Sequence, residues 1–362
     1  MSLDQNGTML GVSVNYQLIE LFNIMNNVKS IDEYNTLKEE FLKSQDFIFP
    51  GIKESSYEEV VNIYDNIVKY CDIITPEAEV KMGVTVKNNV PLFKNESINK
   101  DVFDFTYLDK IVLFAKQNML KVRLHTLVWH KYFPKILDDC SKEQITSFLD
   151  SYFSCIASRY GNDFFPCIDV LNEIASENFE DEEILRESKW KEKLGDDYYL
   201  TVLVLARKYF PKALLVYNEY DELNKYKREC IIKIVNKIKE KEKKSGLLLL
   251  NCLGLQSHYH EFVKVQEIEE AFWDLSLTNK DLQITESDIV KVSDNNSDKI
   301  FNTILECSLK YKVKYFSFWG PTSKVSWKSL RVRTFLDDKG NVDVVCRKIV
   351  EAFSFKENVR SS

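Results

Sequence analysis

Proline and glycine are scarce in this sequence, with seven and ten residues in a chain of 362. Flexible linkers between domains are commonly rich in these residues, and no low-complexity stretch interrupts the chain. A chain of this length forms either one large α/β domain or two ordinary ones. The lack of a linker favours a single domain, which we expect to span residues 1–355, with 356–362 as a C-terminal tail.

Long hydrophobic runs are also missing. The longest, GLLLLNCLGL at 246–255, is far shorter than the roughly 20 residues of a membrane-spanning helix, so we expect no membrane partner. The amino-terminal MSLDQNGTML has no basic segment followed by an apolar one, so we expect no export signal in the chain as given. This indicates a cytoplasmic location, and an extracellular one stays open if a signal peptide was removed.

An excess of positive charge is absent as well, because the formal net charge is −7. Nucleic acids and anionic membranes bind basic surfaces, so we expect neither as a partner, and a neutral substrate fits better. The eight cysteines form no C-x-x-C pair. We therefore expect reduced thiols in the core and no disulfide framework.

The sequence does contain a repeated alternation of β-rich and helical segments. Short β-rich runs occur at 9–15, 71–76, 121–129, 167–172, 213–220, 247–259, 282–287 and 313–320. Helical patterns occur at 57–70, 142–161, 196–210, 227–244 and 297–312. Eight such strands predict an α/β fold, a (β/α)8 TIM barrel. The segment 16–56 has a helical pattern but no place in the alternation, and we interpret it as an insertion after strand 1.

Polar residues gather where the predicted strands end, which is where barrels of this kind carry their active sites. They are Glu77, Lys81, His125, Trp129, His130, Asn172, Glu173, Asn218, Glu219, Gln256, His258, Glu286, Asp288 and Trp319. A pattern set by stability alone would scatter such groups over both ends of the barrel. We therefore expect one functional rim.

Two carboxylates of this rim, Glu173 after the fourth strand and Glu286 on the seventh, are expected to face each other across the mouth. Hydrolysis of a glycosidic bond needs one protonated and one ionised carboxyl group, and their separation, about 5–5.5 Å or about 6.5–9.5 Å, decides between retention and inversion. The sequence leaves that distance open. The residues expected to bind sugar are Glu77, Lys81, His125, Trp129, Asn172, Tyr217, Gln256, His258, Trp319 and Trp327.

Several of these residues have other interpretations. Glu173 alone could be a carboxylate that interacts with a helix N-terminus. Asp169 and Asp288 are better read as supporting or ion-paired groups than as catalysts. His258 and His260 share one face of HYH and could ligate the metal of a metal-dependent hydrolase. No further Cys, His or Asp spacing supports that reading, so we expect neither a metal nor another cofactor.

Seven segments carry a family resemblance: ITPEAEVK (74–81), VRLHTLVWH (122–130), IDVLNE (168–173), the stretch 185–221, LGLQSHY (253–259), ITESD (284–288) and FSFWGPTSKVSW (316–327). They resemble glycoside hydrolase family 10, the β-1,4-xylanases, in the family's order and over roughly 70–355. The resemblance implies a catalytic barrel that hydrolyses xylan or xylo-oligosaccharides with retention of configuration. In it, Glu173 would be the acid/base and Glu286 the nucleophile.

The resemblance also implies roles for the surrounding residues. Asn172 would bind the hydroxyl at C2 of the sugar beside the cleaved bond, and His258, with Gln256, would hold Glu286 ionised. The donor sugar sites would be lined by Lys81, His125 and Trp129 and walled by Trp319 and Trp327. A cis peptide is implied between His125 and Thr126. We expect the protein to be a monomer.

Some positions depart from the family pattern. Ala78 stands where the family usually has an Asn that holds the second donor-side sugar. Tyr132 occupies the second position of a pair that is usually Ser-Gln. Ser323 replaces a usual Asp. These changes leave a second hypothesis open, a carbohydrate-binding barrel that has lost catalysis or changed its specificity.

Overall fold

The computed structural model of the chain describes residues 8–49, 51–178, 183–291, 296–327 and 332–353. Its main feature is a sheet in the order β5-β2-β1-β12-β11-β9-β8-β7-β6, in which neighbouring strands are parallel. The two end strands, β5 (Lys121–Val122) and β6 (Leu124–Trp129), belong to one extended segment. The sheet therefore closes through this segment, which confirms the predicted (β/α)8 barrel.

Each predicted β-rich run contains a barrel strand. The remaining strands are β1 (Met9–Val14), β2 (Ile73–Pro76), β7 (Cys167–Asn172), β8 (Leu214–Glu219), β9 (Cys252–Leu255), β11 (Asp281–Val290) and β12 (Tyr315–Phe318). The predicted run 247–259 was wrong in extent, because β9 begins only at Cys252 and a separate strand, β10 (His258–His260), follows it. β10 pairs with the long β11, as does β13 (Val332–Arg333) in antiparallel fashion.

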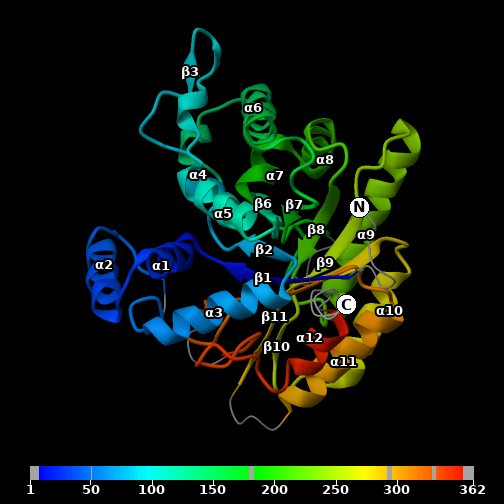
Figure 1. The fold of residues 1–362 in the computed structure, drawn as a ribbon. Helices are drawn as coiled ribbons and strands as arrows, with labels where there is room; N and C mark the ends of the chain where they lie inside the picture. The colour runs from blue at the N-terminus through cyan, green and yellow to red at the C-terminus, as the bar shows by residue number, and fades with distance from the viewer. Residues whose placement is uncertain (1–7, 50, 179–182, 292–295, 328–331, 354–362) are drawn as a thin grey trace.

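Helices surround the barrel (Figure 1). Those predicted from the sequence are α3 (Tyr57–Tyr70), α6 (Lys142–Tyr160), α8 (Tyr198–Tyr209), α9 (Lys225–Ser245) and α11 (Ser297–Lys310). Helices that the sequence patterns did not single out are α4 (Met82–Thr85), α5 (Thr106–Gln117), α7 (Lys189–Leu194), α10 (Val265–Ser276) and α12 (Arg347–Phe353). A short hairpin of β3 (Phe93–Lys94) and β4 (Ser97–Ile98) projects from the barrel (Figure 1).

The segment 16–56 forms two helices, α1 (Tyr16–Asn27) and α2 (Ile31–Lys43). α1 begins at the Asn15 cap, whose side chain accepts from the backbone N–H of Leu18 at 3.0 Å, and it packs against α3 and α5. That this segment is an insertion within a single domain stays a prediction. The predicted tail, 356–362, lies outside the described residues.

Both faces of the barrel strands are buried, as parallel strands between a packed interior and a ring of helices require. All six residues of β7 are buried. Met9, Ile73, Cys167 and Tyr315, from strands on opposite sides of the barrel, form one small cluster, which is possible only across the interior. All eight cysteines are free, and six of them are buried.

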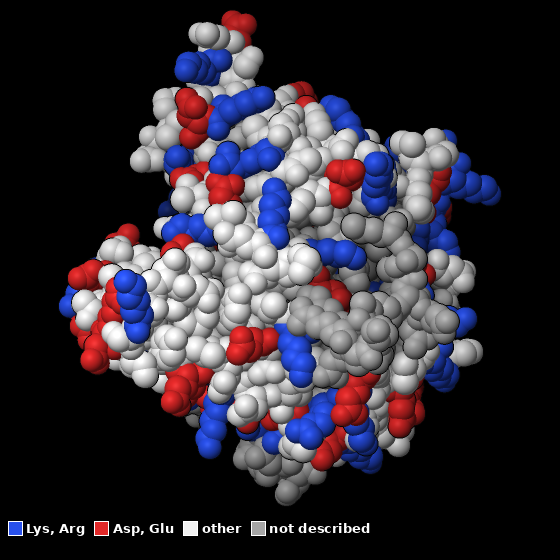
Figure 2. All heavy atoms as spheres, in the orientation of Figure 1, with Lys and Arg blue, Asp and Glu red and all other residues white. Residues whose placement is uncertain are grey.

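The surface carries charges of both signs. On the face shown in Figure 2, Lys and Arg side chains are interspersed with Asp and Glu, and neither sign forms a continuous field. Among the helices in the described part of the chain, none is both long and apolar enough to cross a membrane.

Candidate active site

A cavity of about 600 Å³ opens at the carboxyl ends of the barrel strands. Eleven of the predicted site residues line it: Glu77, Lys81, His125, Trp129, Asn172, Glu173, Gln256, His258, Glu286, Trp319 and Trp327. Among them are three carboxyl groups, two histidines and three tryptophans, and the eleven residues come from seven strands or the turns after them. Such a mixture of flat apolar faces and convergent polar groups fits a sugar.

Glu173 follows β7 directly and has a positive φ of 57°. This left-handed conformation is uncommon for a residue other than glycine, and two backbone hydrogen bonds hold it. The Glu173 N–H donates to the carbonyl of Asn218 at 2.9 Å, and Nε of Arg186 donates to the Glu173 carbonyl at 3.0 Å. The sharp turn lets the strand end while the side chain enters the cavity.

Two neutral donors hold the Glu173 carboxyl group. Nε1 of Trp129 donates to Oε2 at 2.7 Å, and Nε2 of Gln256 donates to Oε1 at 3.1 Å. Nδ1 of His130 lies 3.8 Å from Oε2 of Glu173. Burial and the charge of Arg186 lower the pKa of His130 to about 4, so the imidazole is neutral at neutral pH. Gln256 was expected to help hold Glu286, but the structure shows its amide donating to Glu173 instead.

Glu286 sits within β11, where the pairing with β12 shifts register between Ile284 and Ser287. Such a bulge re-aims a side chain. Nδ2 of Asn218 donates to Oε1 of Glu286 at 2.7 Å, and Nε2 of His258 donates to Oε2 at 3.2 Å. Burial alone would raise the pKa of Glu286, but the charges of His125, His258 and Lys81 outweigh burial and lower it. Glu286 is therefore ionised in the free site.

His258 is held between two carboxylates. Its Nδ1 donates to Oδ1 of Asp288 at 2.8 Å while its Nε2 donates to Glu286. Burial lowers the pKa of His258, but Asp288 and Glu286 outweigh it and raise the pKa to about 10. Asp288 also accepts from Nε1 of Trp327 at 2.8 Å. With both ring nitrogens donating to carboxylates, His258 offers no lone pair to a metal in this arrangement.

A buried hydrogen-bonded series, from Arg123 through Asp169, holds the ring of His125 in place. Asp169 accepts from Nε of Arg123 at 2.8 Å and from Nδ1 of His125 at 2.9 Å. Burial would raise the pKa of Asp169, but Arg123 and His125 lower it, so the carboxylate stays charged. The peptide between His125 and Thr126 is cis, as the resemblance implied. His125 Nδ1 lies 3.9 Å from Oε1 of Glu286.

Asn218 was expected on the rim but not as part of the site, and the structure gives it a central place. Its Nδ2 donates to Glu286 and also to Oδ1 of Asn172 at 2.9 Å, while its Oδ1 accepts from Thr285 at 2.6 Å. A Cβ on Gly254 would come within 2.4 Å of that Oδ1, so the glycine makes room for the amide. The sequence signal was that Asn172 and Asn218 stand near the ends of successive predicted strands, and the structure makes them register partners.

Lysine and tryptophan side chains lie together in one part of the cavity. Nζ of Lys81 lies 4.6 Å from the ring centroid of Trp129 and 5.9 Å from that of Trp319. Nζ of Lys131 lies 4.9 Å from the Trp129 ring centroid. Burial lowers the pKa of Lys81 although four glutamates raise it. Burial raises the pKa of Glu77 to about 7.

Of the three residues that depart from the family pattern, two line the cavity and one does not. Ala78 and Tyr132 line it, and the Tyr132 ring packs 5.2 Å from that of Trp129. A Cβ on Gly83 would meet that ring at 2.2 Å, so Tyr132 depends on this glycine. Ser323 is not among the lining residues and instead donates to Oδ1 of Asp338.

One predicted binding residue lies elsewhere. Tyr217 is fully buried, and its hydroxyl donates to Oε2 of Glu219 at 2.7 Å. Alternation along β8 explains this position, because Tyr217 and its neighbour Asn218 point to opposite faces of the strand. Tyr220, three residues on, lines the cavity instead.

Comparison with known proteins agrees with this geometry. The family model described as glycosyl hydrolase family 10 matches residues 38–348. The chain belongs to this family. Membership in family 10 confirms the enzyme class expected from the sequence, a glycosidase.

Relatives of this family 10 chain are themselves named as xylanases. Endo-1,4-beta-xylanase A of Thermotoga neapolitana is 32% identical over 251 residues, which are 63% of this chain and 23% of that protein. Endo-1,4-beta-xylanase A of Caldicellulosiruptor saccharolyticus is 26% identical over 289 residues, 73% of this chain and 79% of that protein. The chain thus spans about a quarter of the first relative and most of the second.

Solved structures show the same fold. A psychrophilic family 10 endo-beta-1,4-xylanase superposes with a TM-score of 0.74 at 21% identity, covering 96% of this chain and 97% of the other. The endo-1,4-beta-xylanase of Caldicellulosiruptor owensensis superposes with a TM-score of 0.71 at 21% identity, again over 96% and 97%.

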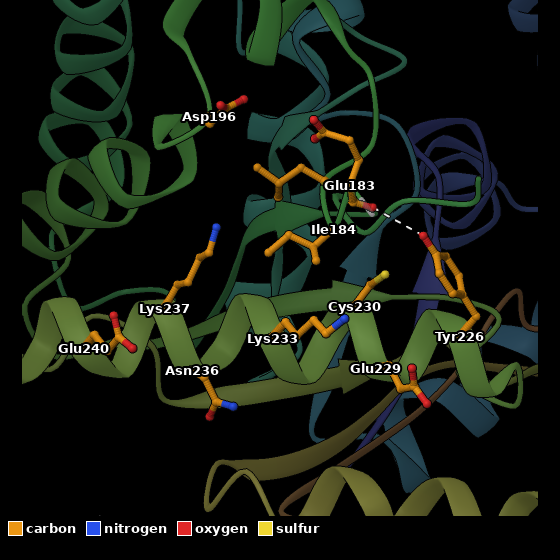
Figure 3. Close-up of a pocket in the computed structure, with 11 residues that line it drawn as sticks. Glu183, Ile184, Asp196, Tyr226, Glu229, Cys230, Lys233, Asn236, Lys237 and Glu240 are labelled. Atoms are coloured by element: carbon orange, nitrogen blue, oxygen red, sulfur yellow. Dashed lines mark hydrogen bonds between the residues drawn. The ribbon is translucent and has the colours of Figure 1, made fainter. Parts of the chain in front are cut away.

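A second cavity, of about 890 Å³, lies apart from the family 10 site, between the segment 183–185 and α9 (Figure 3). Tyr226 closes one end, where its hydroxyl donates to the carbonyl of Glu183 at 3.4 Å. Acidic and basic side chains both line this cavity. Glu183 forms an ion pair with Lys191, with Oε2 and Nζ 2.7 Å apart. None of its described lining residues belongs to the predicted site.

Proposed function

We propose that the chain hydrolyses β-1,4-linked xylan or xylo-oligosaccharides with retention of configuration, by a double displacement. Glu173 acts as the acid/base and Glu286 as the nucleophile. The observation that carries this proposal is the contrast between the surroundings of the two carboxyl groups. Retaining glycosidases need two such groups with opposite protonation, flanking the bond that is cleaved.

Glu286 suits the nucleophile because its donors favour the ionised form. A protonated imidazole, an amide and the nearby Lys81 charge all stabilise a carboxylate. The same donors fix the orientation of both oxygens, so one of them faces the cavity in a single geometry. Fixed geometry of this kind lowers the entropy cost of attack.

Glu173 suits the acid/base because its hydrogen-bond donors are an indole and an amide. Neither donor carries a charge that would oppose protonation. Its near neighbour His130 is neutral. A carboxyl group with neutral donors can donate a proton in the first step and accept one in the second.

In the first step, Glu173 transfers its proton to the glycosidic oxygen as Oε of Glu286 forms a bond to the anomeric carbon and the bond to the leaving sugar breaks. In the second step, Glu173 takes a proton from water, whose oxygen attacks the same carbon and releases Glu286. The charge of Glu286 disappears in the covalent intermediate. That change favours the ionised form of Glu173, which is the form that acts as a base.

The remaining lining residues bind the sugar chain. Asn172, oriented by Asn218, donates toward the sugar beside the cleaved bond, and Trp129 and Trp319 supply flat faces. Ala78 offers no hydrogen bond at the donor end, so we infer a weaker grip on the second donor sugar than in chains with Asn there. The hypothesis of a barrel without catalysis is not favoured, because both carboxyl groups and their donors are in place.

The test is the anomeric configuration of the first product, followed by proton NMR during hydrolysis of xylohexaose. Retention predicts that the β-anomer appears first and converts slowly to the α-anomer. An initial α-anomer would overturn the double displacement, and the absence of any product would favour a sugar-binding barrel instead. Cellohexaose, run in parallel, tests the preference for xylose.

A further inference from the structure

The segment 45–49, after α2, reaches the rim of the active-site cavity and is held there rigidly. Gln17 is fully buried at the start of α1. Its Nε2 donates to the carbonyl of Phe47 at 2.6 Å, and its Oε1 accepts from the N–H of Phe49 at 2.8 Å. Tyr16 donates through its hydroxyl to Gln45 at 2.6 Å. A buried amide thus fixes the backbone on both sides of residue 48.

Contacts of this segment place it at the donor end. The Phe49 ring lies 6.4 Å from that of Tyr16, edge to face. The N–H of Tyr16 in turn donates to Oε1 of Glu79 at 2.7 Å. Glu79 lies in the sequence between Glu77 and Lys81, which line the cavity and which we assign to the donor end.

The other end of the segment abuts the loop after β12. Gly51 has a φ of 75°, and a Cβ there would come within 2.2 Å of the carbonyl oxygen of Lys324. That loop continues to Trp327, which also lines the cavity. The segment is therefore packed against the barrel at two places, and its aromatic side chains are presented from a fixed backbone.

Phe47 and Phe49 lie on the same side of this segment, with ring centroids 5.3 Å apart. Phe49 lines the cavity, whereas Phe47 is 64% exposed. Exposure of a large aromatic ring to water is unfavourable, and a rigid exposed ring next to a sugar cavity is the surface on which the apolar face of a sugar packs. Phe47 thus lies beside a residue that lines the cavity, without lining it itself.

We propose that Phe47 and Phe49 form an additional sugar-binding subsite, built by the segment after α2, that holds a distal residue of the same glycan at the donor end. The inference rests on the proposed function. It explains how a cavity with Ala78 in place of a hydrogen-bonding residue keeps hold of its substrate: affinity comes from stacking on the next sugar outward. Longer oligosaccharides are then preferred over short ones. Little ordering cost is incurred on binding, because Gln17 has already fixed the segment.

The test is substrate-length dependence in the Phe47→Ala variant. The ratio of kcat/KM for xylohexaose to that for xylotriose should fall about three- to tenfold relative to the unaltered protein, the range that loss of one stacking contact gives. Phe49→Ala should lower the ratio in the same direction. Trp273→Ala, which removes an aromatic ring that is 57% exposed on α10, should leave the ratio unchanged.

Binding separates this subsite from the chemistry. In a Glu286→Gln background, calorimetry should show that Phe47→Ala weakens xylohexaose binding several-fold and xylotriose binding much less. An unchanged or increased length ratio, with normal thermal unfolding, would overturn the subsite while leaving the hydrolase intact. Unaltered protein that neither cleaves nor binds either oligosaccharide would instead overturn the proposed function on which the inference rests.

Discussion

The Nε2 atom of His258 lies 3.2 Å from Oε2 of Glu286. Because Asp288 takes the other ring nitrogen at 2.8 Å, and ionised carboxylates only accept hydrogen bonds, both ring nitrogens must carry protons. The imidazole is therefore a fixed cation beside Glu286. Together with His125, Asn218 and Lys81, this cation keeps Glu286 ionised and oriented, whereas the side chains that donate to Glu173 are the neutral Trp129 and Gln256.

The first prediction concerns the pH dependence of stability. The pKa of His258 is raised to about 10 from 6.5, so its pairing stabilises the folded protein fully below pH 6.5 and less and less as the pH rises toward 10. The free energy of unfolding of His258→Asn should accordingly lie below that of the unaltered protein by an amount that shrinks over this range. Urea denaturation at pH 6, 8 and 10 measures it, and a constant difference would contradict the assignment.

The second prediction concerns Asn218. Removing its amide leaves Oε1 of Glu286 without a donor and frees the Asn172 side chain, so Asn218→Ala should lower kcat on the order of 10²-fold, as for other oriented donors in active sites. The matched control is Asn27→Ala, at the exposed end of α1, where the amide bonds only the preceding turn. Steady-state kinetics on xylo-oligosaccharides decides the point, and a loss below threefold would rule out a central role for this residue.

The third prediction concerns the acid/base. Glu173→Ala should lose most activity on xylo-oligosaccharides but much less on a dinitrophenyl xylobioside, whose leaving group departs without protonation. Azide should then restore turnover by attacking the covalent intermediate and should yield the β-glycosyl azide. Product analysis by NMR identifies the anomer. Equal losses on both substrates, or an α-azide, would assign Glu173 another role.

The fourth prediction concerns the donor end. Ala78→Asn adds a hydrogen-bonding amide to the cavity and should lower KM for xylotriose about three- to tenfold, with kcat little changed, since one hydrogen bond contributes about 1 kcal/mol. Ala78→Leu has a similar volume but no amide, and serves as the control. If both variants behave alike, the effect is one of space and not of hydrogen bonding.

Much of the fold and of the site could be predicted from the sequence, for definite physical reasons. The strand CIDVLN is apolar because parallel strands are buried on both faces, and Glu173 directly after it must then emerge at the mouth. The same reasoning found Glu286 and the tryptophans. Two helices of segment 16–56 could only be described as a helical pattern, since nothing in the sequence says what they pack against.

Side-chain partners were harder to predict than positions. Gln256 lay on the correct rim, yet its amide contacts Glu173 rather than Glu286, because a position on a strand end does not fix which of two neighbouring carboxyl groups a flexible side chain reaches. Tyr217 was predicted to bind sugar, but its side chain lies on the face of β8 opposite to that of its neighbour Asn218. The first half of the run 247–259 is almost continuously apolar, so its pattern could not show that regular pairing starts only at Cys252.

Trapping the covalent intermediate tests the central claim most directly. A 2-fluoro-xylobioside with a good leaving group should inactivate the enzyme, since the fluorine slows the second step more than the first. Mass spectrometry of the digested protein should then find a single fluoroglycosyl label, on Glu286. A label on Glu173 or on another residue would contradict the assignment of the nucleophile, and inactivation without any label would contradict the covalent mechanism.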